Sequence, residues 1–217
     1  MRGKVLLIAL ALLAGSCGCA PSAAHTSADD SAASAPPRPI DKVRAGIVSV
    51  NSQFEKSSQS AQDVTNASAG GSFRSDRGRF SKDLESLDVA VAQLRSDAVE
   101  LRERATEYLA LWSGQKVTVT ASGAVGGYPD QRRAQVKAKY DQMVADMQQA
   151  NRGASPLMAD MKELEKKLAG GRDEAQSQSL RSQSNRISEE TAQVRSHLDS
   201  ALKTLDELTA MLNEKNG

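Results

Sequence analysis

Two cysteines, Cys17 and Cys19, are the most reactive side chains of the 217-residue chain, and no other cysteine follows them. A disulfide framework needs cysteines spread along the chain, so a pair confined to one end is difficult to explain in that way. Covalent attachment of another group is the alternative chemistry for these thiols. The residues that precede them favour this alternative.

Arg2 and Lys4 come before an apolar run from Val5 to Leu13, and small residues follow at positions 14–16. This three-part layout is typical of a secretory signal and predicts that residues 1–16 form a signal peptide. A permanent membrane span is the weaker interpretation, because the run is much shorter than the ~20 apolar residues that a spanning helix needs.

The sequence "LLAGSC" resembles the lipobox of bacterial lipoproteins. The resemblance implies that Cys17 is lipidated on its thiol and becomes the mature N-terminus. Leu13 and Ala14 stand one place further from the cysteine than in the commonest lipobox, so Cys19, after Gly18, is a poorer alternative site. Ordinary cleavage beside two incidental cysteines is the other alternative.

Lipidation implies a protein attached to a membrane of the cell envelope, held durably by acyl chains at ~0.8 kcal/mol per buried methylene. In Gram-negative lipoproteins, an aspartate after the lipidated cysteine favours the inner membrane, and Gly18 holds that place here. By that analogy we expect the periplasmic face of the outer membrane.

Residues 17–39 contain almost no large apolar side chain, and serine, alanine and proline dominate them. Such a segment cannot offset the entropy lost on ordering, which predicts a flexible tether. His25 lies in it without neighbouring ligands, so a solvated histidine is favoured over a metal ligand or an acid–base group.

Charge and composition argue against nucleic acid as a partner. Without Arg2 and Lys4 the mature chain keeps 26 of the 28 basic residues against 27 acidic ones, a net charge of −1, and only 3% of residues are aromatic. It therefore lacks both a phosphate-neutralising surface and aromatic platforms for bases.

Groups that suit catalysis or metal binding are sparse in the rest of the chain. His197 is the one histidine beyond the tether and fits a helix surface, while Glu189 and Glu190 are adjacent and so point in different directions. The glycine-rich "GAVGG" lacks the lysine of a phosphate loop. We expect no enzymatic activity, no cofactor and no metal.

Four series of apolar residues, spaced alternately by three and four, predict four long helices. Ser184 and Thr191 occupy apolar slots of the last series. We expect the second helix between Gly78 and Gly114 and the third between Pro129 and Gly170. The series run from Ile40 to Val64, from Phe80 to Trp112, from Val136 to Leu168 and from Leu180 to Leu212.

The helices are expected to fold back on one another rather than form separate coiled coils. Ala92 and Val99 widen the second stripe, as a helix that faces two neighbours requires, and glycine-rich breaks are short enough for reversals. The prediction is an all-α, elongated antiparallel bundle or coiled coil of about four helices over residues 40–217. Packing of the same stripes between copies, as a homo-oligomer, is the alternative.

Two interruptions break the helical pattern. Residues 114–127 alternate like a strand at Val117–Thr120, but a second convincing strand is lacking, so we predict a mobile loop. Pro156 lies inside the third series, whose stripe continues in phase, so we favour a bend within one helix over a break.

Trp112 and Met158 are the candidate interaction residues. Trp112, at the end of its helix, caps the bundle or marks a contact patch beside the loop. Met158 lies off the apolar stripe, where exposure would suit a partner. Met143, Met147 and Met161 lie on the stripe and are assigned to the core.

The order of parts resembles a bacterial family of helical lipoproteins known only as a domain of unknown function. The resemblance covers most of residues 40–212 and departs where Lys166–Leu168 run into a glycine pair. Because the family has no established activity, it implies no functional residues. The motifs are Gln53-Phe54, Leu111-Trp112, Tyr140, Met147 and Pro156-Leu157.

The function that follows is a lipid-anchored periplasmic helical bundle that acts as a non-enzymatic scaffold or interaction module with an envelope protein partner. A periplasmic holdase, with apolar surface between loosely packed helices, is the first alternative. A peptidoglycan-associated spacer is the second, and Lys215 is not terminal, which disfavours covalent attachment.

Overall fold

The computed structural model describes the helical part of the chain. The expected signal peptide, both cysteines, His25 and almost all of the tether lie outside the described residues, so the assignments made there stay predictions. The backbone is described for 38–67, 71–114, 118–119, 125–126, 130–170 and 174–213, and side chains for 38–67, 72–110, 131–170 and 176–213.

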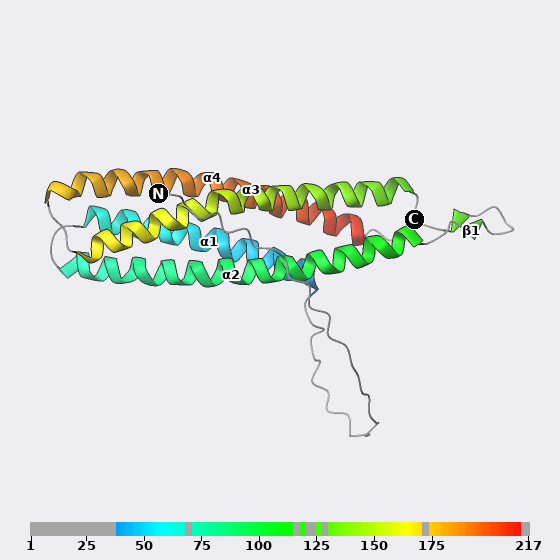
Figure 1. Ribbon diagram of the computed structural model, residues 1–217, viewed down its shortest axis with the longest axis horizontal. Coiled ribbons are helices and arrows are strands. Elements are labelled where there is room, and N and C mark those ends of the chain that lie inside the picture. The colour runs from blue at the N-terminus through cyan, green and yellow to red at the C-terminus, as the bar shows by residue number, and fades with distance from the viewer. Residues whose placement is uncertain are drawn as a thin grey trace, which may run out of the picture. The chain divides into compact units, whose positions relative to one another are not determined.

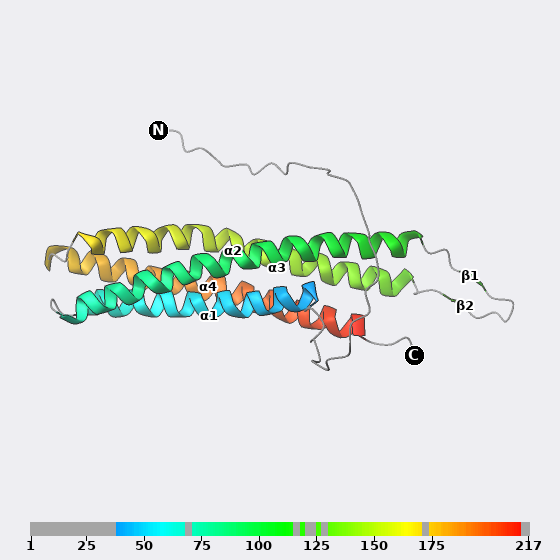
Figure 2. The same cartoon turned by 90° about the horizontal axis from the view of Figure 1, so that it is seen from below.

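Four long helices make up most of the described part, and consecutive helices run antiparallel (Figure 1). The same arrangement is visible from below (Figure 2). The predicted all-α bundle is therefore confirmed. The helices are α1 (Pro39–Asn66), α2 (Gly71–Gly114), α3 (Asp130–Ala169) and α4 (Glu174–Asn213).

Helix α1 begins where a proline makes a helical start favourable. Pro39 occupies the first turn, where its missing N–H would have had no helical partner. The Arg38 guanidinium donates to both carboxylate oxygens of Asp41, at 2.8 and 3.2 Å, and this acidic residue in the first turn complements the helix dipole. These local features fix the start of α1 close to the predicted Ile40.

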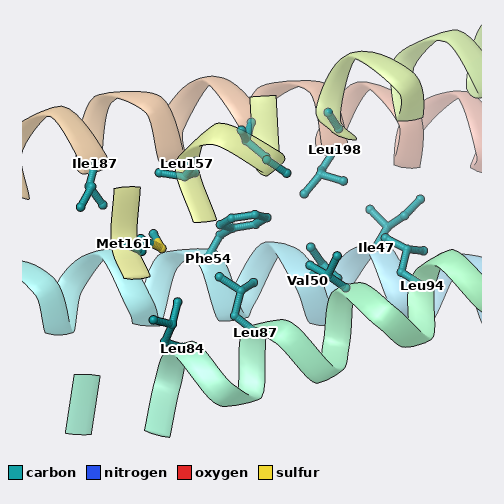
Figure 3. Close-up of a cluster of buried hydrophobic side chains, with 14 of the residues drawn as sticks. Ile47, Val50, Phe54, Leu84, Leu87, Leu94, Leu157, Met161, Ile187 and Leu198 are labelled. Carbon is teal, nitrogen blue, oxygen red and sulfur yellow. The ribbon is translucent and has the colours of Figure 1, made fainter. Parts of the chain in front are cut away.

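Most buried apolar side chains of the four helices form one core along the bundle, and Val136 of α3 with Leu208 of α4 forms a small second cluster. Figure 3 shows Phe54 of α1 lying between Leu87 of α2 and Leu157 of α3. Ser184 and Thr191 are buried as well, which confirms that both occupy slots of the α4 stripe. The three-and-four spacing thus located the core correctly along most of each helix.

The contacts around the bundle are unequal. Helix α1 packs closely on α2 and α4, and α3 packs closely on α4, whereas α2 and α3 touch each other much less. Ion pairs cross the close interfaces but contribute little each because their side chains are largely exposed. They include Lys42–Glu100 (α1–α2, 2.8 Å), Arg44–Asp206 (α1–α4, 2.7 Å) and Lys139–Glu207 (α3–α4, 2.6 Å).

Helix α3 continues through Pro156, so the prediction of one helix rather than two is confirmed. Pro156 and Arg152 are exposed, so water can satisfy the Arg152 carbonyl that the missing proline N–H leaves unbonded. Nearby, Gly153 lets α3 approach α4 closely: a Cβ atom there would lie 2.9 Å from Cγ2 of Val194.

Two expectations about element boundaries are wrong. Helix α2 begins at Gly71, ahead of the predicted Gly78, and Phe73 in the added turns packs against the core. Strand β1 (Thr118–Val119) has an antiparallel partner, β2 (Val125–Gly126), although no second strand was expected. The partner was missed because Val125 and Gly126 carry no alternation of polar and apolar residues.

Candidate functional site

An apolar groove of about 460 Å³ opens between α2 and α3; we call it the α2–α3 groove. It reaches the centre of the bundle, because Val50 and Phe54 of α1 and Val194 and Leu198 of α4 line it as well. Its apolar walls are Val91, Leu94, Ala98, Val99 and Leu101 of α2, and Tyr140, Met143, Val144, Met147, Ala150 and Ala154 of α3.

Small side chains on the facing walls explain why the bundle leaves this space. Alanine side chains leave unfilled the space that larger apolar residues would occupy; they belong to Ala98 of α2 and to Ala150 and Ala154 of α3. Closer to the α1–α2 turn, Asp88 of α2 pairs with Lys162 of α3 at 2.8 Å. Seen from below, α2 and α3 cross near the middle of their lengths (Figure 2).

The charged residues that line the groove are both arginines. Arg95 and Arg102 lie two turns apart on one face of α2, about 10 Å along the helix axis. Arg95 donates to Oδ1 of Asn151 at 3.1 Å, whereas the Arg102 guanidinium has no hydrogen-bond or ion-pair partner among the described residues. No carboxylate lines this groove, so its rim is positive in character.

Tyr140 adds a phenol at the end of the groove nearer to the start of α3. Its partial burial raises the pKa of the hydroxyl, the positive charge of Arg102 opposes that rise, and the negative charge of Asp141 adds to it. Tyr140 therefore stays protonated at neutral pH and can donate a hydrogen bond.

A second hollow, of about 430 Å³, adjoins the groove where α1 begins. Leu101 and Tyr140 line both spaces, so the two are contiguous. Tyr108 of α2 and Leu212 of α4 also line the second hollow and are exposed, although both belong to predicted core stripes. Helix α1 begins only at Pro39, so these ends of the longer helices lack its cover.

The two candidate interaction residues belong to different helices, Trp112 to α2 and Met158 to α3. Trp112 lies in the last turn of α2, and its side chain is outside the described residues. Met158 is half-buried and packs against the core, so its predicted exposure is wrong; its flexible, unbranched side chain suits such a gap. Met143 and Met161 are buried as predicted, and Met147 is half-buried against the core. Met143 and Met147 also line the groove.

Ala92 and Val99 behave differently from the prediction that they widen the core stripe. Both are exposed, and Val99 keeps 57% of its surface in contact with solvent. The prediction is wrong because α3, the second neighbour of α2, does not close over this face. The groove itself was not predicted; Val99 between Arg95 and Arg102 is the sequence signal that could have indicated it.

Catalytic or metal-binding groups do not converge in the described part of the chain. His197 is exposed on α4, and Glu190 lies 3.6 Å from Nε of Arg186. No cluster of three or more His, Cys, Asp or Glu residues suited to a metal occurs among the described residues. None of the described helices combines the length and apolar character that crossing a membrane requires.

Comparison of the sequence with protein-family models, curated proteins and solved structures gives no match. The resemblance to helical lipoproteins of unknown function, like the lipobox at Cys17, therefore stays a prediction. The α2–α3 groove is the feature that the geometry offers for binding.

Proposed function

We propose that the protein is a non-enzymatic binding module of the cell envelope, anchored by lipid at Cys17 and engaging its partner through the α2–α3 groove. The groove is the single observation that carries the proposal. The bundle keeps apolar side chains of α2 and α3 open to solvent there, at a continuing cost in hydration free energy.

The tether and anchor predicted from the sequence complete the proposal. A flexible segment between an acylated cysteine and α1 lets the bundle reach partners beside the membrane while it stays attached. We place the protein at the periplasmic face of the outer membrane because of Gly18.

Photo-crosslinking in cells tests this function. A benzoylphenylalanine at Val99, on the rim of the groove, should give a discrete adduct with an envelope component, and mass spectrometry identifies whether it is protein or lipid. The same probe at Val48, exposed on α1, is the matched control because it lies outside the groove. Equal adducts at both positions, or none at Val99, would contradict the proposal.

A periplasmic holdase is a second candidate that the same groove favours. Apolar walls containing the flexible Met143 and Met147 can adapt to varied unfolded segments. Suppression of aggregation of a model client at near-stoichiometric ratio, lost when Ala98→Phe fills the groove, would support it over a dedicated partner.

A further inference from the structure

We infer that the α2–α3 groove binds a long-chain fatty acid, with its acyl chain in the apolar slot and its carboxylate at Arg95 and Arg102. The inference rests on the proposed function only in taking the groove as the binding surface. It adds the chemical class of the occupant.

The depth of the slot favours a narrow, flexible chain. Side chains of α1 and α4, such as Phe54 and Leu198, lie behind the walls formed by α2 and α3, so an occupant must pass between two helices to reach them. A single polymethylene chain can do so without parting the helices. The volume of about 460 Å³ falls in the range of small-molecule sites.

The charge of the rim favours an anion at one end of that chain. Arg95 and Arg102 are the charged lining residues, and each guanidinium can donate two hydrogen bonds to a carboxylate. The Arg102 guanidinium makes no hydrogen bond or ion pair with another described residue, so it can bind the anion without first breaking such an interaction. Met143 and Met147 let the walls adapt to the chain.

Titration of the purified full-length protein with cis-parinaric acid, a fluorescent fatty acid, tests the inference. Binding should be saturable with one site, and palmitate should displace the probe. Each methylene buried in the slot strengthens binding about fourfold, so myristate, which is two methylenes longer, should compete about 15-fold better than laurate. The methyl ester of parinaric acid lacks the carboxylate and should bind about tenfold more weakly than the acid.

Variants separate the slot from the rim. Arg95→Gln with Arg102→Gln should weaken binding of the acid about tenfold and leave the ester unchanged, whereas Arg74→Gln, an exposed control at the other end of α2, should change neither. Ala98→Phe on one wall and Val144→Trp on the other should each block both ligands. Circular dichroism verifies that each variant keeps its helices.

The outcomes distinguish this inference from the proposed function. Equal binding of acid and ester, unaffected by the arginine changes, overturns the role of the rim. Unchanged binding in both wall variants that keep their helices overturns the site. Absence of fatty-acid binding, with a protein adduct still formed at Val99, overturns the fatty acid as occupant while the binding module stands. Fatty-acid binding without any adduct at Val99 in cells contradicts the proposed function instead.

Discussion

Replacing a glycine by alanine at two helical positions, Gly78 and Gly153, should have different effects on stability. Alanine is favoured over glycine inside a helix by about 1 kcal/mol. A Cβ atom at Gly78 of α2 meets nothing within 4 Å, so Gly78→Ala should raise the free energy of unfolding by about that amount. For a domain of this size, the melting temperature should rise by about 2–4 °C.

At Gly153 of α3 the added Cβ would lie 2.9 Å from Cγ2 of Val194, well inside the ~3.5–4.0 Å at which carbon atoms normally touch. Val194 is buried on α4, and a β-branched side chain in a helix has little freedom to rotate away. The helices must therefore separate, and overpacking of this kind costs about 1–3 kcal/mol. Gly153→Ala should consequently be at least about 1 kcal/mol less stable than Gly78→Ala.

Urea denaturation of the two variants, followed by circular dichroism, measures this difference directly. Helix propensity contributes equally to both substitutions, so the comparison isolates the steric cost at the α3–α4 contact. If Gly153→Ala proved as stable as Gly78→Ala, the close approach of the two helices at Val194 would be refuted.

Three further predictions concern other parts of the molecule. Thr191→Val and Thr204→Val alter equally buried positions of α4; Thr191 Oγ1 has no partner among the described residues, whereas Thr204 Oγ1 donates to a backbone carbonyl at 3.0 Å. Thr191→Val should raise the free energy of unfolding by about 1 kcal/mol, and Thr204→Val should lower it by a similar amount. Urea denaturation measures both changes, and changes of equal sign would contradict the different hydrogen bonding of the two hydroxyls. The hydrogen bond from Lys139 holds the pKa of Glu207 below its usual value of 4.5, so this pair stabilises the fold above that pH and ceases to as pH falls through the lowered pKa. The melting temperature of the wild type should therefore exceed that of Lys139→Met at neutral pH, and the difference should shrink as the pH is lowered; a difference independent of pH would count against the pair. Cys17→Ser should abolish incorporation of labelled palmitate, and normal labelling would move the anchor to Cys19 or remove the basis for lipidation.

The helices could be predicted from sequence because their cores depend on periodicity. Slots such as Leu87, Leu157 and Ile187 recur every three or four residues, and even Ser184 followed its stripe into the core. The early start of α2 depends instead on Phe73, which packs on the core from outside the main series. The pairing of strands β1 and β2 at Val125 joins two very short segments.

The groove could not be predicted, because periodicity shows which face of a helix is apolar but not whether a neighbour covers it. Val99 has the same sequence signature as a core residue, yet the contacts of α3 with α4 hold α3 away from it. Ala98 and Ala150 then leave space that larger side chains would have closed. The groove depends on the relative placement of all four helices, which the apolar periodicity of the sequence does not specify.

Repeating the crosslinking at Val99 with the groove filled tests the central claim most directly. The adduct formed in cells by the probe at Val99 should disappear when Ala98→Phe is added, while the bundle keeps its helical circular dichroism. An undiminished adduct in the filled variant would show that the partner does not occupy the α2–α3 groove.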